Sequence, residues 1–424
     1  MLTTLVVAFV FFALIGMPIA ISLGIASALA LAFSPFPTVA AVQKWLTGID
    51  SYTLLAIPLF ILAGQLMNVG GVTYRIFNFA QALVGHIPGG LAHANIVASI
   101  IFAGMSGSAV ADAAGLGLVE MEAMTSHGYD ERFSAAVTAA SSVIGPIIPP
   151  SIPMLLYASI AEESVGKLFL GGIIPGLMMG ISMMLLVYFL ALKRGYPKEE
   201  RVRLRQLAAI FIDTLPALLS PVIIIGGMLT GIFTATEAAA VTVGYAFVLS
   251  AFVYRELKLK DVPAMLLDTV YSTAVVTFIL SAAAAAGWIL VRSRAGHAMA
   301  DFVLSVTSNR YVVLLLLNIL LLLLGCVMEL GAIMILTVPV LIPLLQNLGI
   351  DLVHFGVVMT VNLMIGFITP PFGMSLFVLS GVTGLKVEEI VKDTTPFLIP
   401  LIITLLLITY IPGLVMAIPN WLMP

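Results

Sequence analysis

Long apolar runs separated by short polar connectors dominate the chain. Two of them, Val312–Leu324 and Ile181–Leu192, are almost uninterrupted and lack the alternation of apolar and polar residues that marks the strands of a membrane barrel. Inside a bilayer the backbone must satisfy its own hydrogen bonds, so this pattern predicts a helical bundle. One crossing needs roughly 20 apolar residues, and the length therefore allows about ten to twelve spans.

The runs predict helices over residues 4–33, 51–69, 73–100, 131–144, 151–160, 168–192, 208–229, 232–254, 263–291, 298–323, 353–365, 372–383 and 395–415. Charged and apolar residues mix at helical spacing in 38–50 and 257–271, which favours helices in the membrane interface. The connectors 193–205 and 255–261 are rich in Lys and Arg. They bracket two spans, so we expect both on the cytoplasmic side.

Composition supports the membrane assignment. Hydrophobic residues make up 61% of the 424 residues and charged residues 9%, whereas a soluble protein has about 25% charged residues. The apolar start of the chain has no charged n-region, and we expect it to be a span rather than a cleaved leader. The sequence contains no G-x-x-x-x-G-K-[ST] loop and no H-E-x-x-H spacing. These absences argue against nucleotide chemistry and a metal centre of that type in this chain, and we expect no organic cofactor.

A shift of 221 residues aligns the two halves of the chain without a gap. The aligned positions are Gly104 with Gly325, residues 128–130 (GYD) with 349–351 (GID), and residues 144–150 (IGPIIPP) with 365–371 (IGFITPP). Matches among Leu, Val and Ala would be uninformative in so apolar a chain, but these glycines, aspartates and prolines are specific. The alignment predicts an internal repeat.

We therefore expect two structural repeats, residues 1–210 and 211–424. Each contains scaffold helices, a hairpin and a broken helix. The predicted hairpins span about 90–126 and 311–347, and the predicted broken helices about 131–160 and 353–383.

The repeated Pro-Pro motif interrupts an apolar segment twice. Proline lacks a backbone N–H and its ring clashes with the preceding turn, so Pro149-Pro150 and Pro370-Pro371 break a helix. Breaks at membrane depth are tolerated where the freed carbonyls are buried or coordinate an ion. A structural kink is the alternative for either break alone, but paired breaks in two repeats are typical of the ion sites of secondary transporters.

A polar stretch, GMSGSAVADAAG at 104–115, precedes the first break. Its apolar flanks are each too short to cross a bilayer, which predicts a re-entrant hairpin with a polar tip. The half-helix that starts near Ser108 would direct its free N–H groups at the tip, where an anion is stabilised. Ser106 and Ser108 offer hydroxyl oxygens to a sodium ion. At the matching point Glu329 either balances a cation or caps a half-helix, or else it is paired with a cation or hydroxyl for structure.

Several other charged residues lie in apolar surroundings. Asp112 is an intramembrane carboxylate, and such residues are costly enough to be functional by default. For Glu120 and Glu237 we favour a structural role as partners between helices. Arg292 offers bidentate hydrogen bonds to a carboxylate substrate, with interfacial anchoring as the alternative, and Arg294 is interpreted as an anchor.

Four segments, 83–117, 135–152, 231–246 and 366–378, resemble the large membrane subunit of tripartite (TRAP) transporters, and the likeness runs over nearly the whole chain. It implies an all-α integral membrane fold of two inverted repeats and an elevator-type movement of a transport part against a scaffold. It also implies Na⁺ as the coupling ion and a location in the bacterial inner membrane. The implied partners are a small four-helix membrane subunit and a periplasmic substrate-binding protein.

The resemblance also implies functional residues. The first sodium site maps to Ser106, Ser108, Gly145, Ile148 and Pro150, and the second to Gly325, Gly366, Thr369 and Met374. Substrate binding maps to Ser108, Asp112 and Arg292. The hairpin and break elements are Gly104, Gly107, Pro149, Glu329, Pro370 and Pro371.

Sequence analysis therefore predicts sodium-coupled import of an organic acid. Sialic acid is favoured, and C4-dicarboxylates or other sugar or keto acids are the alternatives. A stand-alone sodium/dicarboxylate symporter without a binding protein is a second interpretation. An intramembrane enzyme is a remote one, because Asp112 and the two serines have no general base nearby in the sequence.

Overall fold

Helices form the regular structure of residues 1–37 and 39–423, the part of the chain that the computed structural model describes. Six helical segments in this part are long and apolar enough to cross a bilayer. They are α11 (Val165–Arg194), α12 (Leu204–Leu229), α13 (Ala235–Val248) with its π-helical continuation η3 (Leu249–Val253), α14 (Val262–Arg292), α17 (Leu330–Asn347) and α20 (Val387–Tyr410).

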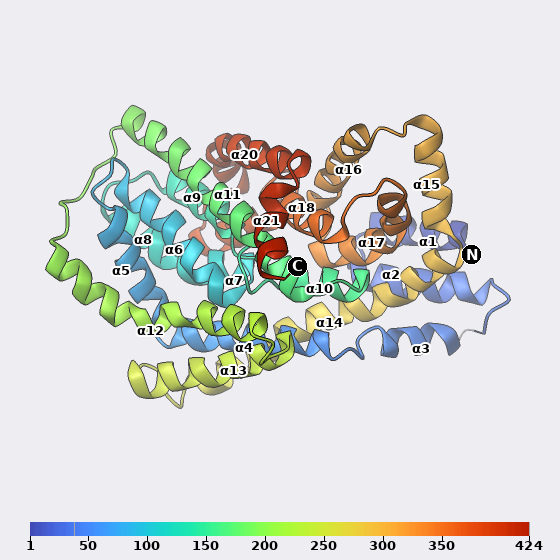
Figure 1. The fold of residues 1–424 in the computed structure, drawn as a ribbon, viewed down its shortest axis with the longest axis horizontal. Helices are drawn as coiled ribbons and strands as arrows, with labels where there is room; N and C mark the ends of the chain where they lie inside the picture. The colour runs from blue at the N-terminus through green and yellow to red at the C-terminus, as the bar shows by residue number, and fades with distance from the viewer. Residues whose placement is uncertain (38, 424) are drawn as a thin grey trace.

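Shorter helices complete the bundle. They are α1 (Leu2–Leu14), α2 (Ile19–Ala32), α3 (Val39–Thr47), η1 (Thr53–Leu55), α4 (Ala56–Val69), α5 (Val72–Val84), α6 (Gly90–Ser106), α7 (Ala109–Ala111), η2 (Asp112–Leu116), α8 (Gly117–Ser126), α9 (Glu131–Ser142), α10 (Ile152–Ala161), α15 (Ala295–Val306), α16 (Arg310–Gly325), α18 (Leu352–Gly366), α19 (Met374–Thr383) and α21 (Gly413–Leu422). In Figure 1 the helices α4, α12, α13 and α14 run along one long edge of the molecule, where α4 packs against both α13 and α14.

Four predicted helices are each divided in two. One of them, 395–415, breaks between α20 and α21 at Ile411 and Pro412. The predicted helix 4–33 breaks between α1 and α2, where Gly16 has a φ of +84° and Pro18 cannot donate a helical hydrogen bond. The predicted helix 73–100 divides into α5 and α6 at Gly89, with a φ of +77°. The predicted helix 298–323 divides into α15 and α16, because Thr307 is extended and the Asn309 side chain caps α16.

Of the two segments predicted to form interfacial helices, one contains a separate helix and the other does not. Helix α3 lies within the first, 38–50, whose residue 38 is outside the described residues. The second, 257–271, is not a separate helix. From Val262 onward it is the start of the long helix α14, since its polar positions do not interrupt the helical hydrogen bonds.

Helix bounds recur with the 221-residue offset of the sequence alignment. Adding 221 to the ends of the arm formed by α7, η2 and α8 (109–126) gives 330–347, the ends of α17. Adding 221 to the first residue of α9, 131, gives 352, the first residue of α18. The match therefore extends beyond the motifs to whole elements.

The repeated Gly-x-Asp motif explains why α9 and α18 begin where they do. Gly128 and Gly349 have positive φ values of +84° and +64°, a conformation that glycine adopts without steric cost. Two residues later, the Asp130 carboxylate accepts hydrogen bonds from the N–H groups of the first turn of α9, and Asp351 does the same for α18. An aspartate in this position satisfies donors that have no partner within the helix.

A sharp elbow joins α4 to α5, which meet at 70° across Gly70 and Gly71. Arg75, one turn into α5, holds this elbow. Its Nη1 donates to the Gly71 carbonyl (2.9 Å) and to Glu256 Oε1 (2.7 Å), its Nε lies 3.3 Å from Asp213 Oδ2, and its guanidinium lies 3.9 Å from the ring centroid of Tyr254. Because Asp213 lies on α12 and Glu256 follows η3, one side chain connects the elbow to two other elements.

We expect Arg75→Ala to lower the stability of the folded protein by about 1.5–3 kcal/mol. Two partly exposed ion pairs and one cation–π contact are each worth roughly 0.5–1 kcal/mol. Thermal unfolding in detergent measures the change, with Arg205→Ala on the exposed start of α12 as the matched control. Equal melting temperatures for the two variants would show that Arg75 does not hold the elbow.

Candidate functional site

The first hairpin reverses direction at Gly107. Helix α6 ends at Ser106, Gly107 has a φ of +59°, and the second arm begins after Ser108, whose Oγ accepts from Ala111 N at 3.4 Å. The free N–H groups at the start of this arm therefore lie at the tip, and Ser108 partly satisfies them.

This tip packs on the first broken helix. Helix α9 ends at Ser142 and α10 begins at Ile152, with residues 143–151 between them in turns. A methyl group built on Gly107 would lie 2.5 Å from the Pro150 carbonyl oxygen, and one on Gly145 would lie 3.4 Å from the Ser108 carbonyl oxygen. The structure thus brings together two segments that are about 40 residues apart in the sequence. Glycine is needed for this close approach of the two main chains.

A face of small residues on α11 supports the break from the other side. Gly172 lies against Ile147, and Gly176 lies against Ile148, at separations that leave no room for a β-carbon. Ser151 begins α10 by accepting from Met154 N at 3.2 Å, and its hydroxyl also donates to the Pro146 carbonyl. Ile148 and Pro150 are therefore held in place by direct contacts with neighbouring elements.

The second tip packs on the second broken helix in the same way. Helix α16 ends at Gly325, and α18 ends at Gly366 before the turns that lead to α19. A methyl group on Gly366 would lie 2.7 Å from the Gly325 carbonyl carbon. Phe372 N donates to the Cys326 carbonyl at 3.3 Å, which adds a main-chain bond between break and tip.

The remaining residues of the predicted second sodium site lie at the same break. The Thr369 hydroxyl donates to the Ile365 carbonyl at 2.6 Å, and Met374 begins α19 with 48% of its surface exposed. Glu329 is the N-cap of α17, and its Oε2 accepts from Ala332 N at 3.1 Å. Of the alternatives for Glu329, this geometry matches the helix cap.

The two tip-and-break units meet in the middle of the bundle. Ser142, the last residue of α9, and Ser375, in the first turn of α19, are both buried, and their Oγ atoms are 3.3 Å apart. Helix α19 packs on η2 and α7, and α10 packs on α17. The half-helices of each unit therefore contact the hairpin of the other.

Several buried oxygens near the first tip have no hydrogen-bond partner among the described residues. They belong to the hydroxyls of Ser99 and Ser106 and to both carboxylate oxygens of Asp112. Asp112 lies beside Ser99 and opens the π-helical segment η2, a feature that is frequent at functional sites. A buried polar group without a partner costs about 1–3 kcal/mol, so the Ser106 hydroxyl and the Asp112 carboxylate, which has the Ser99 hydroxyl beside it, are candidate ligands for an ion.

No hydrogen bond or ion pair of the described residues places Arg292 at the first tip. Arg292 is the last residue of α14, it is exposed, and its guanidinium lies 5.4 Å from the ring centroid of Phe36. Within the described chain no hydrogen bond or ion pair connects it to Ser108 or Asp112. Arg294, predicted to be an anchor, follows α14 with a φ of +53°.

Among the described residues neither Glu120 nor Glu237 joins two helices as predicted, although Glu237 has a structural role within one helix. Glu237 is exposed and belongs to the capping box of its own helix α13, where its Oε2 accepts from Thr234 N at 2.8 Å. Glu120 is fully buried, but neither of its carboxylate oxygens has a hydrogen-bond partner in the described part of the chain. Neither carboxylate connects two helices.

Sequence reasoning missed two buried hydrogen bonds made by asparagine side chains. Each of them fixes one hairpin to its broken helix. Asn95 on α6 accepts from the Ser141 hydroxyl at 2.7 Å, and Asn318 on α16 accepts from Asn362 Nδ2 at 2.9 Å. Ser141 and Asn362 are 221 residues apart, so these bonds occupy matched places on α9 and α18. The available signal was Asn318, a single amide within a run of leucines.

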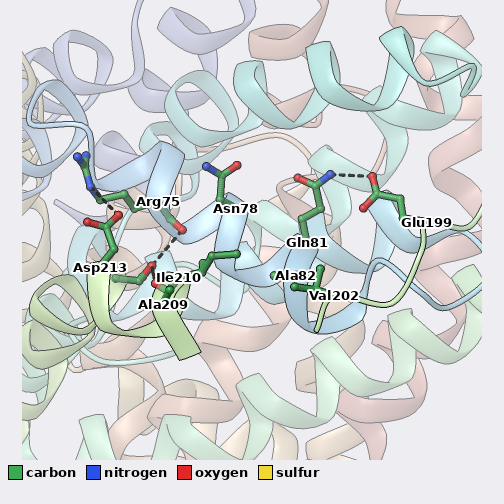
Figure 2. A pocket seen from close by; sticks show the side chains of 10 residues that line it. Arg75, Asn78, Gln81, Ala82, Glu199, Val202, Ala209, Ile210 and Asp213 are labelled. Atoms are coloured by element: carbon green, nitrogen blue, oxygen red, sulfur yellow. Dashed lines mark hydrogen bonds and ion pairs between the residues drawn. The ribbon is translucent and has the colours of Figure 1, made fainter. Parts of the chain in front are cut away.

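A groove of about 480 Å³ that is lined in part by polar side chains lies away from both tips, between α5, α12 and the connector that precedes α12. Figure 2 shows Arg75 directed at Asp213 and Gln81 directed at Glu199, with Asn78 between them. The Gln81 Nε2 to Glu199 Oε1 distance is 2.7 Å. These side chains satisfy one another, in contrast to the unpartnered oxygens of the first tip.

Comparison with known families decides between a transporter subunit and an intramembrane enzyme, the classes of protein considered above. The family model for the tripartite ATP-independent periplasmic transporter, DctM component, matches residues 5–414. The chain belongs to this family. It is therefore a transport component of the inner membrane and not an enzyme, which confirms the resemblance and the membrane assignment.

Among similar DctM-family proteins is the sialic acid TRAP transporter large permease protein SiaM of Vibrio cholerae, 46% identical over 380 residues, which cover 90% of this chain and 89% of that one. The sialic acid TRAP transporter permease protein SiaT of Haemophilus influenzae is 43% identical over 97% of this chain and 67% of its own length. The C4-dicarboxylate TRAP transporter large permease protein DctM of Pseudomonas aeruginosa is 41% identical over 95% of this chain and 94% of its own.

The crystal structure of the YdaH transporter of Alcanivorax borkumensis has a similar fold. Its TM-score is 0.59 with 16% sequence identity, and the match covers 97% of this chain and 98% of that one. This likeness confirms the all-α membrane fold class.

We expect Gly366→Ala to reduce substrate uptake at least tenfold. Its methyl group would lie against the Gly325 main chain, which has no side-chain freedom to yield, and the second tip would have to move. Uptake into proteoliposomes, normalised to inserted protein, measures the effect. Gly226→Ala in α12 is the control, because a methyl group there meets no atom within 4 Å. Wild-type uptake by Gly366→Ala would contradict the close packing of tip and break.

Proposed function

We propose that this chain is the permease of a sodium-coupled importer of organic acids, with sialic acid as the favoured substrate. The observation that carries the proposal is the paired arrangement of hairpin tip and broken helix, matched at one register, with unpartnered hydroxyl and carboxylate oxygens at the first tip. Oxygen atoms are the ligands that hard cations prefer.

The sodium ions occupy the two tip-and-break units in this proposal. Ser106, Ser108, Gly145, Ile148 and Pro150 form the first site, and Gly325, Gly366, Thr369 and Met374 form the second. Each ion would join a hairpin tip to a broken helix, and bound substrate, contacted by Ser108, Asp112 and Arg292, would favour the same joined state. Sodium therefore raises the affinity for substrate, and substrate raises the affinity for sodium by the same factor.

The substrate class is supported by the relatives. The names of the relatives described above include sialic acid and C4-dicarboxylates, which are all carboxylic acids. The starts of α7 and α17 place helix N–H groups at the two tips, where an anion is stabilised. The higher identities belong to the two sialic acid permeases, so sialic acid is favoured over a C4-dicarboxylate.

Movement is proposed to follow an elevator mechanism. The residues 1–210 and 211–424 form two inverted repeats, in which the hairpins and broken helices move together against a scaffold that includes α4, α12, α13 and α14. The contacts between the two tip-and-break units support movement as one body. A small four-helix membrane subunit and a periplasmic binding protein complete the proposed system. The family description supports this in so far as it calls the transporter tripartite and periplasmic.

We expect Ser106→Ala to raise the sodium concentration for half-maximal uptake about tenfold. The variant removes one oxygen ligand, worth roughly 1.5 kcal/mol or more toward a charged group, and breaks no hydrogen bond of the protein. Uptake into proteoliposomes with the small subunit and binding protein is measured against sodium concentration. Ser27→Ala, a buried serine on α2, is the control. An unchanged sodium dependence would remove the first tip from the coupling mechanism.

A further inference from the structure

A second groove, of about 340 Å³, lies between α4, α13 and α14 and is lined by apolar residues alone. Leu62 and Leu66 of α4 form one wall, and Val243 and Phe247 of α13 form another. Gly244 is also part of the lining, and a methyl group built on it would meet no atom within 4 Å. The groove is therefore open space at this residue.

The groove belongs to the lipid-facing side of the bundle. Helix α13 with η3 and helix α14 are both long and apolar enough to cross the bilayer, and Phe247 and Leu266 at the groove are each 45% exposed. Atoms that line an unfilled groove lose their dispersion contacts, so a flexible hydrocarbon chain is the natural occupant. Selectivity among lipids must come from the headgroup, because the bilayer interior is as apolar as the groove.

Basic residues flank one end of the groove. Leu257 and Val262 both line it, and between them lie Lys258, Leu259 and Lys260. The two lysines are exposed, and Leu259 is 91% exposed, an arrangement that suits insertion into the interface between lipid and water.

The charge at this end is positive. Glu256 is engaged by Arg75 at 2.7 Å, so Asp261 is the remaining acidic residue of the segment 255–261. Arg255 and the two lysines outnumber it. Basic residues close to the membrane attract anionic headgroups.

We propose that the groove between α4, α13 and α14, together with Lys258 and Lys260, binds an anionic phospholipid. One acyl chain occupies the groove and passes Gly244, and the phosphate lies at the two lysines. The proposal concerns the α4, α13 and α14 surface and does not depend on sodium coupling.

Native mass spectrometry of the full chain tests the headgroup. Phosphatidylglycerol and phosphatidylcholine with identical acyl chains are titrated onto the detergent-purified protein. The wild type should bind phosphatidylglycerol more tightly. Lys258→Gln/Lys260→Gln should lose roughly fivefold in phosphatidylglycerol affinity for each lysine and leave phosphatidylcholine binding unchanged. Lys193→Gln/Lys198→Gln, two exposed lysines of the other connector, should behave as the wild type.

A second variant tests the groove. Gly244→Leu should fill the groove and lower the affinity for both lipids. The variant should fold, because the added atoms enter open space on a helix. Gly226→Leu on α12, where an added β-carbon also meets no atom within 4 Å, should bind both lipids as the wild type does.

Three outcomes would overturn the proposal. One is equal affinity of the wild type for the two lipids. Another is an unchanged phosphatidylglycerol affinity in either the double lysine variant or Gly244→Leu. The third concerns the small membrane subunit: if Gly244→Cys in the assembled complex forms a cross-link to that subunit, a protein helix and not a lipid covers the groove.

Discussion

The requirement that every backbone polar group be satisfied within a bilayer governs this structure. A chain that interrupts two helices deep in the bundle must surround the freed N–H and C=O groups with protein. Here each interruption is covered by the tip of a hairpin, and the tip itself exposes the N–H groups of a new half-helix. Ser108 and Glu329 cap those half-helices, and Ser151 caps α10 after the first break. Hairpin and break therefore depend on each other.

Close approach of main chains makes this mutual cover possible, and it explains the glycines of the repeated motifs. Gly107 meets Pro150, and Gly366 meets Gly325, at separations that exclude a β-carbon. The matched bonds of Asn95 and Asn318 to α9 and α18 then fix each hairpin arm to its broken helix. Glycine allows the contact, and a buried amide defines its register, because an unpaired amide in this environment is costly.

Sequence reasoning located the segments but not their contacts. The Pro-Pro motifs predicted the breaks because proline removes a main-chain donor regardless of its surroundings, and the helix bounds follow those breaks. The divided helices at Gly16 and Gly89 were missed although a local signal was present, since Pro18 follows the first glycine and the second lies in the run Pro88-Gly89-Gly90. Glu120 was predicted to have a partner on another helix, and the fold does not provide one. Its environment depends on the packing of α8, which no local pattern specifies.

The two tips share a backbone plan but differ in charge and in hydrogen bonding. The first tip has hydroxyls at positions 106 and 108 and a buried Asp112, and three of these side-chain oxygens have no partner among the described residues. At the second, Thr369 donates to its own helix and the Glu329 carboxylate accepts from Ala332 N. A cation at the first tip would contact oxygens that have no hydrogen-bond partner. At the second tip the Thr369 hydroxyl is already held by the carbonyl to which it donates, and Glu329 Oε2 already accepts an N–H. The first unit therefore has the stronger physical demand for an ion, and the two proposed sodium sites, though related by the repeat, are expected to differ in affinity.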